Sequence, residues 1–490
     1  MSKQVSKTLL FCLAITFGTV QTSAEDEDYN EDYDQNWHET DHYTFYGKDT
    51  DRWENQTCCV GTTGIGVKAL RDLTSGRANT AVGHHSLKGA TTGSNNTAVG
   101  YEAMKYGLTT SNNIAIGSQA LRYNRGNHNI GIGVGAHGGR ATGSHNVAIG
   151  FQGLEKNAGT ANIAIGNGAL KKNSSGGGNI AVGLGAMGVN TLGEDNVAMG
   201  RSTLLKNIGG NDNTAIGIMA LKENEESGNT AVGAYALRDN TYGKENAAVG
   251  HSALLQCCSV KGGENSAFGF EALSTSKEGY ANVAVGAYAL KLNQSKINTA
   301  IGTRAGEEST GFGNVFIGFM AGHKETGNNQ LIINNAGPES GPPLIKGSFA
   351  PAKLEVNGDF TADSVSRRSD ARLKTDIRPI ENPLQTILKL HGKQYRFKDS
   401  AAQDLGLLAQ DLEKVLPELV SETDDGFKAI SYSSLTALLI EAMKEQQKDF
   451  EGKLTALEQE NVSLKAMMSG QMQELLARVA ILEGASLVAN

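Results

Sequence analysis

The sequence predicts a mainly β protein: a trimeric parallel β-roll, or solenoid, of 16–17-residue repeats, followed by a small α+β domain and a C-terminal coiled-coil helix. Its 490 residues include 61 glycines but only 7 prolines and 6% aromatic residues. This composition suits regularly spaced tight turns better than one large packed core. One short pattern recurs over residues 62–337, whereas Leu, Lys and Glu become frequent after residue 369. The change indicates a repeat array followed by a helix-containing domain.

The repeat consists of asparagine, any residue, alanine, valine or isoleucine, and glycine, with leucine or its equivalent four residues after the glycine. Successive asparagines are 16 or 17 residues apart, except for one interval of 19. This period is too short for a helical hairpin but allows two short strands and two turns, so each repeat is predicted to form one solenoid coil. The anchoring asparagines are Asn79, Asn96, Asn113, Asn129, Asn146, Asn162, Asn179, Asn196, Asn213, Asn229, Asn246, Asn265, Asn282, Asn298 and Asn314.

Strand alternation predicts which side chains of a repeat share a face. After Asn96, it places Thr97 and Val99 on one face and Ala98 on the other. We expect Met104 to contribute to the core, and the small alanine face to let a neighbouring chain approach closely. The asparagines are expected to support turns by bonding nearby backbone, in preference to binding a glycan or ligand.

These repeats resemble the heads of YadA-type trimeric autotransporter adhesins. The resemblance covers more than half of the chain. It implies left-handed parallel β-rolls wound three together, and therefore a homotrimer.

The N-terminus has the pattern of a secretory signal peptide over residues 1–24. Lys3 and Lys7 precede an apolar run at residues 9–20, which is too short to span a membrane, and small residues follow at 22–24. Residues 25–61 form an acidic, Tyr-rich segment that is expected to be disordered, because residues 25–53 hold eleven carboxylates against two basic residues. We expect a protein that is secreted, at a cell surface or on a virion, without membrane insertion after signal removal.

Charge and cysteine usage restrict the partners. The net charge of −8 argues against nucleic acid as a partner, because a protein needs a basic face to bind the phosphate backbone. Four cysteines remain after signal removal, in two adjacent pairs: Cys58 with Cys59, and Cys257 with Cys258. They could form disulfide links between chains or be buried free thiols, and the sequence does not decide between these alternatives. Neither pair has the two-residue gap that suits a metal ion, so no metal or cofactor is expected.

The repeat register ends at residue 337, and residues 338–368 are predicted to form a β-stem before the domain at 369–432. Ser369 and Lys374 open that domain five residues apart, so a turn would bring hydroxyl and amine together. A lysine accepts a serine proton only when its amine is neutral, which requires burial or a nearby positive charge. Arg372 is a candidate for that charge, and Asp370 is a candidate for holding the turn through its side chain.

Further stretches follow Ser369 in a fixed order: RLKTDI at 372–377, GLLAQDL at 406–412 running into LPELV at 416–420, and AISYSSL at 429–435. Together they resemble the intramolecular chaperone domain of phage endosialidases and tail spikes, a self-cleaving peptidase-type domain. The resemblance implies trimerisation, Ser369 as nucleophile, Lys374 as partner base, and self-cleavage between Arg368 and Ser369. His391 leaves a serine–histidine arrangement open, although a single histidine in such a place is more often structural.

Residues 433–490 are predicted to form a helical coiled-coil tail. An apolar face first forms at Leu435, Leu438, Leu439 and Ala442. A seam then alternates steps of four and three residues, which is typical of a coiled coil. The seam residues are Phe450, Leu454, Leu457, Asn461, Leu464, Met468, Gln471, Leu475, Arg478 and Leu482.

The combined prediction is a secreted trimeric fibre or adhesin, with a cell-surface glycan or receptor as its external partner. Its C-terminal domain is expected to act as an intramolecular trimerisation chaperone and as a serine endopeptidase that acts once, in cis. The alternative is a glycan-degrading or glycan-binding tail-spike-like protein matured by the same domain. The repeats offer no paired acidic residues in an aromatic-lined insert, which a glycosidase would need.

Overall fold

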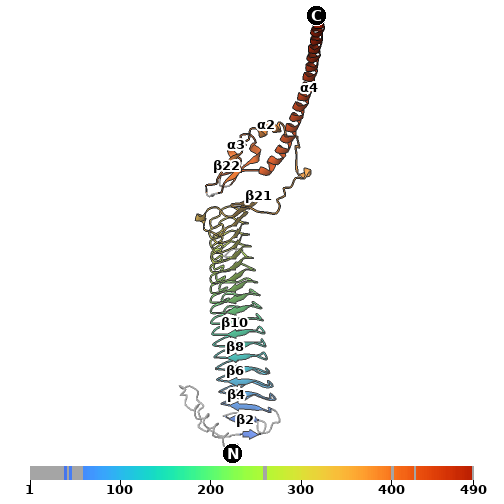
Figure 1. Cartoon of the computed structure of the whole chain (residues 1–490). Helices are drawn as coiled ribbons and strands as arrows, with labels where there is room; N and C mark the ends of the chain where they lie inside the picture. The colour runs from blue at the N-terminus through green and yellow to red at the C-terminus, as the bar shows by residue number, and fades with distance from the viewer. Residues whose placement is uncertain are drawn as a thin grey trace, which may run out of the picture. The chain divides into compact units, whose positions relative to one another are not determined.

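The computed structural model describes residues 38–40, 43–46, 59–257, 262–398, 402–423 and 426–487. The chain divides into two compact units, Met1–Thr361 and Ala362–Asn490 (Figure 1). The signal peptide predicted for residues 1–24 and most of the acidic segment lie outside the described residues, as do Cys58 and Cys258. Cys257 is buried and disulfide-bonded.

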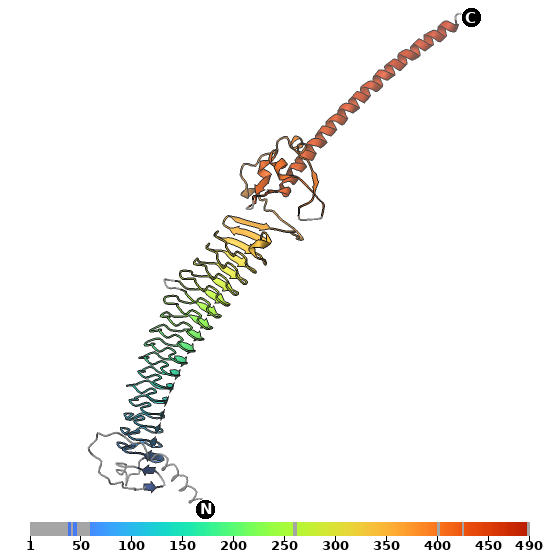
Figure 2. The same cartoon turned by 90° about the vertical axis from the view of Figure 1, so that its left-hand side faces the viewer.

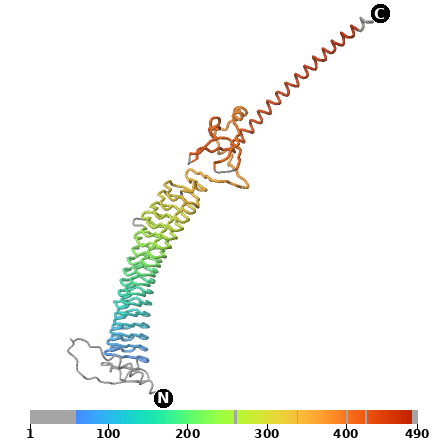
Figure 3. Tube along the Cα trace, turned by 60° about the vertical axis from the view of Figure 1, so that its left-hand side comes forward, coloured from blue at the N-terminus to red at the C-terminus, as the bar shows by residue number. Residues whose placement is uncertain are grey.

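The first unit is a parallel β-solenoid, which confirms the predicted mainly β fold (Figure 3). Strands β3 to β18 pair in parallel and in register, each with the next along the chain. At the first end, β2 pairs in parallel with β3 and antiparallel with β1. At the other end, β19, β20 and β21 pair antiparallel.

The strands have the following bounds: β1 His38–Thr40, β2 Tyr43–Tyr46, β3 Thr62–Ile65, β4 Thr80–Val82, β5 Thr97–Val99, β6 Ile114–Ile116, β7 Ile130–Ile132, β8 Val147–Ile149, β9 Ile163–Ile165, β10 Ile180–Val182, β11 Val197–Met199, β12 Thr214–Ile216, β13 Thr230–Val232, β14 Ala247–Val249, β15 Ser266–Phe268, β16 Val283–Val285, β17 Thr299–Ile301, β18 Val315–Ile317, β19 Gln330–Ile333, β20 Ile345–Phe349 and β21 Ala352–Val356. A 3₁₀ turn, η2, spans Pro338–Ser340 before β20.

Each coil contains one short strand, so the expectation of two strands per coil was wrong. The second half of the coil is built from turns, in which Leu87 and Met104 have φ of 46° and 50°. Residues with φ in this left-handed region cannot continue an extended strand. Stacking nevertheless continues there, because the Leu87 amide donates to the Ala103 carbonyl of the next coil at 3.0 Å.

The alanine face forms the inside of the coil. Ala98, at the centre of β5, is fully buried, whereas Thr97 and Val99 on either side point outward and are half-buried. The alternation was therefore predicted correctly, but the expectation that the alanine face meets a neighbouring chain was wrong. The central side chain of strands β4 to β17 is alanine or glycine, and in the coil of β5 Met104 fills the rest of the core as predicted. The Thr/Val/Ile face is the outward side of the strands.

The repeated asparagines connect successive coils through buried hydrogen bonds. The backbone amide of Asn179 donates to Asn162 Oδ1 at 3.0 Å, and Asn179 Oδ1 accepts from the backbone amide of Asn196 at 3.1 Å. Asn179 Nδ2 donates to the Gly193 carbonyl at 2.8 Å. The side chain thus satisfies backbone groups of the next coil, in addition to any turn that it supports, and it is fully buried.

Replacing Asn179 with aspartate is expected to lower the free energy of unfolding by about 2–4 kcal/mol. The shape is kept, but the Nδ2 donor is lost and a carboxylate oxygen faces the Gly193 carbonyl in a buried place. Denaturant unfolding of the purified protein measures the effect. An exposed substitution, Lys172→Gln, is the control, and equal midpoints for both variants would contradict the role given to the ladder.

The second unit is a small α+β domain that continues into a long helix. It contains η3 Ala371–Leu373, α2 Pro383–Ile387, β22 Lys393–Tyr395, β23 Asp404–Gly406, α3 Ala409–Glu413, η4 Pro417–Leu419, β24 Val420–Glu422, β25 Lys428–Ile430 and α4 Tyr432–Leu487. The strands form two antiparallel pairs, β22 with β23 and β24 with β25. Figure 2 shows α4 running out from the rest of this domain as one continuous helix.

The first turns of α4 belong to the domain core. Leu435 and Leu438 are buried against Leu412 of α3, with surrounding residues of α2, η4 and β25 packed around them. Glu445 of α4 accepts a hydrogen bond from the Leu384 amide at the start of α2 at 2.9 Å. Beyond this point the seam side chains of α4 are exposed in the single chain, among them Leu457. No helix in the described part of the chain is long and apolar enough to cross a membrane.

Candidate active site

A single turn brings Ser369 and Lys374 together. Lys374 Nζ donates a hydrogen bond to Ser369 Oγ at 2.7 Å. The turn is η3, in which the Leu373 amide donates to the Asp370 carbonyl and the Lys374 amide donates to the Ala371 carbonyl, both at 3.1 Å. The five-residue spacing seen in the sequence therefore becomes direct contact between hydroxyl and amine.

Asp370 holds this turn with its side chain. Its Oδ1 accepts the Arg372 amide at 2.9 Å, and its Oδ2 accepts Arg372 Nη2 at 2.7 Å. The adjacent guanidinium lowers the pKa of the Asp370 carboxyl, and the carboxylate raises the pKa of Arg372. Because this ion pair offsets the Arg372 charge, Arg372 serves the turn, and the hypothesis that it activates Lys374 loses its basis in the single chain.

Ser369 and Lys374 are both exposed in the single chain. Lys374 acts there as the donor and Ser369 as the acceptor, which is the reverse of the proton transfer that a base requires. His391 is also exposed, and no hydrogen bond between described residues joins it to Ser369. The geometry therefore favours the serine–lysine pair over the serine–histidine pair.

Tyr432, at the start of α4, makes a contact that the sequence did not reveal. Its hydroxyl accepts the Leu407 amide at 2.8 Å. A side chain at Gly406 would meet this hydroxyl at 2.6 Å and the Tyr395 hydroxyl at 3.0 Å, which explains the glycine. Both residues lie in stretches singled out in the sequence, but a contact across 25 positions leaves no local signal.

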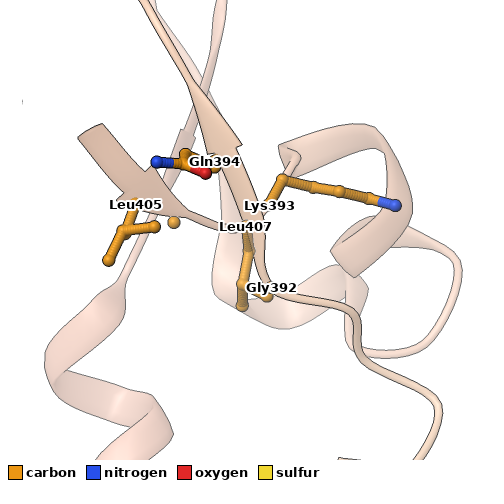
Figure 4. A pocket seen from close by; sticks show the side chains of 6 residues that line it. Gly392, Lys393, Gln394, Leu405 and Leu407 are labelled. Carbon is orange, nitrogen blue, oxygen red and sulfur yellow. The ribbon is translucent and has the colours of Figure 1, made fainter. Parts of the chain in front are cut away.

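An open hollow lies along β22 and β23 and contains neither Ser369 nor Lys374 (Figure 4). It is lined by Gly392, Lys393, Gln394, Leu405, Gly406 and Leu407. Leu405 is largely exposed, so the lining is a surface rather than an enclosed cleft. The serine–lysine pair therefore lies outside this hollow.

The fold and the site together define a β-solenoid protein with a separate C-terminal α+β domain. Residues 369–421 match the sequence model of the family described as chaperone of endosialidase. The match begins at Ser369 and includes Lys374, which agrees with the resemblance proposed from the sequence.

Curated relatives are long tail fibre proteins of phages. The chain is 38% identical over 118 residues to long tail fiber protein Gp37 of Enterobacteria phage K3, which covers 22% of this chain and 10% of the relative. It is 40% identical over 118 residues to Gp37 of Enterobacteria phage T2, covering 22% of this chain and 9% of the relative. For Gp37 of Enterobacteria phage Ox2, the identity is 39% over 103 residues, covering 19% of this chain and 40% of the relative.

These matches are partial. The chain spans about a tenth of the length of the first two relatives. No solved structure matches the chain. The relatives are tail fibre proteins and not adhesin heads, so the YadA-type resemblance of the repeats stays a prediction.

Proposed function

We propose that this chain is a subunit of a trimeric fibre whose C-terminal region is an intramolecular chaperone and is released by self-cleavage between Arg368 and Ser369. The match to the chaperone-of-endosialidase family and the relatives from phage tail fibres support this function. The phage relatives favour a virion as the site of the fibre. Export through the signal peptide predicted for residues 1–24 remains a prediction from the sequence.

The observation that carries the proposal is an uncharged face along the whole solenoid. The first and third positions of strands β4 to β18 point outward and contain no charged residue. The third position is a large apolar residue in all fifteen strands, for example Ile116, Ile165 and Ile301, which are 41%, 38% and 44% exposed. Because the strands stack in register, these side chains form continuous rows.

The size of this face favours association between chains. From the exposed fractions, the third-position row alone presents on the order of 1,000 Å² of apolar surface, whereas the largest patch on a typical monomer is about 300–600 Å². A standard interface buries about 800 Å² on each partner. Other copies of this chain present the same uncharged rows at the same spacing, so they fit this face along its full length.

A repeating face also creates a register problem that a chaperone would solve. Two chains displaced by one coil keep nearly all of their contacts, so the solenoid face specifies register only weakly. The α4 helix offers an independent contact, because its exposed seam contains the polar residues Asn461 and Gln471 among apolar ones. Buried polar residues in a seam fix register and the number of strands.

The proposed cleavage is an acyl shift followed by hydrolysis. Ser369 Oγ attacks the carbonyl carbon of Arg368 while Lys374 takes the hydroxyl proton. The bond from that carbon to the Ser369 nitrogen breaks, and Lys374 returns the proton to the nitrogen, which becomes a free amine. Water then hydrolyses the ester, giving the Arg368 carboxylate and restoring the Ser369 hydroxyl.

Placing glutamate at two positions of the apolar face, Ile116→Glu with Ile165→Glu, is expected to abolish the trimer. In a single chain both side chains reach water, so the coil itself tolerates the charge, whereas in a trimer charges of one sign would be brought together without water. Light scattering after size exclusion measures the assembly state. The expected result is a wild-type trimer and a monomeric or aggregated variant.

The control is Lys172→Glu, which also changes charge but lies on an exposed turn outside the strand face. This control should stay trimeric. A monomeric wild type, or a trimer that survives both glutamates, would show that the apolar face is not the contact between chains.

A further inference from the structure

The segment that leads to the proposed cleavage site has little support of its own. Residues 362–369 are exposed and form no helix or strand. Before Ser369, this segment makes one side-chain hydrogen bond to any described residue: Arg367 Nη1 donates to Ser434 Oγ at 2.8 Å. The contact joins positions 67 residues apart, and it falls one residue before the proposed cleavage bond.

Ser434 is held firmly by the folded domain. It lies in the first turn of α4, where its amide donates to the Ser431 carbonyl at 3.1 Å and its hydroxyl lies 2.9 Å from Ser431 Oγ. The Ser431 amide in turn donates to the Leu419 carbonyl at 2.9 Å. The next residue, Leu435, is buried in the domain core. The exposed segment before Ser369 is thus bonded to a residue that the domain core holds in place.

We propose that Ser434 is a positioning residue for self-cleavage, which holds the chain before the Arg368–Ser369 bond by binding Arg367. The inference rests on the proposed cleavage. Arg367 is fixed by α4 on one side of the bond, and Ser369 is fixed by Lys374 on the other. Holding both sides restricts the carbonyl and the attacking oxygen to fewer arrangements, which lowers the entropic part of the barrier.

The contact has little value for stability. The guanidinium lies at the N-terminal end of α4, where the helix dipole disfavours positive charge, and the bond is exposed to water. A contact that adds little to stability but lies beside the proposed scissile bond is expected to influence the reaction rather than the fold. Because Ser434 belongs to α4, the helix that carries the predicted trimer seam also presents the cleavage segment.

Ser434→Ala is expected to slow cleavage about three- to tenfold, the effect of one hydrogen bond to a charged group in a partly exposed place. The full-length chain is followed on denaturing gels from synthesis onward, and the rate is taken from the loss of the uncut band. The trimer and the thermal unfolding temperature should not change. Ser434→Thr keeps a hydroxyl and should restore most of the rate. Ser433→Ala, on the same turn and without a side-chain hydrogen bond to the described segment, should cleave like wild type.

A double-variant comparison separates positioning from a general effect on the domain. Arg367→Gln alone should slow cleavage by a similar factor, and adding it to Ser434→Ala should slow the reaction little further, because both remove the same bond. Wild-type rate in Ser434→Ala, or effects that multiply in the double variant, would overturn the positioning role while self-cleavage stands. An uncut wild-type chain would overturn the proposed cleavage and the positioning role together.

Discussion

The Ser369→Ala chain is expected to remain full length while it still forms trimers. The substitution removes the attacking oxygen, whereas the exposed position of Ser369 means that no core packing is lost. Lys374→Ala should have the same result, because the hydroxyl then has no base, and a fall of at least about a hundredfold in rate is expected. Denaturing gels measure the uncut chain, and N-terminal sequencing of the small fragment locates the wild-type cut.

Lys374→Arg tests whether proton acceptance is what matters. A guanidinium can donate to Ser369 Oγ as the amine does, but it stays protonated, so cleavage should fail. Cleavage of the wild type should follow trimer formation, because further chains are expected to bury the pair. Undiminished cleavage in Ser369→Ala, or a fragment that does not begin at Ser369, would place the active site elsewhere.

The repeats made most of the solenoid predictable. A period of 16–17 residues and the alternation around Ala98 specify one strand of each coil and its two faces. They do not specify which face is inside, because the alanines fit equally well in a narrow core and at a close contact between chains. The burial of Ala98 decides the matter, and it moves the expected contact between chains to the valine and isoleucine rows.

The site was predictable where its contacts are local. Ser369, Asp370 and Lys374 lie within one turn, so their spacing allows them to meet once the segment bends. The contact between Arg367 and Ser434 depends on how the whole domain packs, and no spacing in the sequence reveals it. The pairing of Arg372 with Asp370 was also not predicted, because Asp370 and Lys374 both lie two residues from Arg372 in the sequence.

The coiled-coil tail allows a test of the chaperone role without damage to the domain core. Removing residues 433–490 would delete Leu435 and Leu438, so any failure could reflect loss of the core. Removing residues 449–490 keeps these leucines and the contact of Glu445 with α2, and residues 449–482 of the deleted part are exposed in the single chain.

This shorter deletion is expected to reduce the yield of soluble trimer by at least about tenfold when the chain is newly synthesised, because the tail raises the effective concentration of chains that must wind together. A preformed wild-type fibre should remain trimeric after self-cleavage has removed the same helix, because by then the stacked coils are closed and only slow unfolding could separate them. Light scattering of both samples gives the comparison. Soluble trimer at wild-type yield from the deletion would show that the solenoid faces find their register unaided and that α4 has no part in assembly.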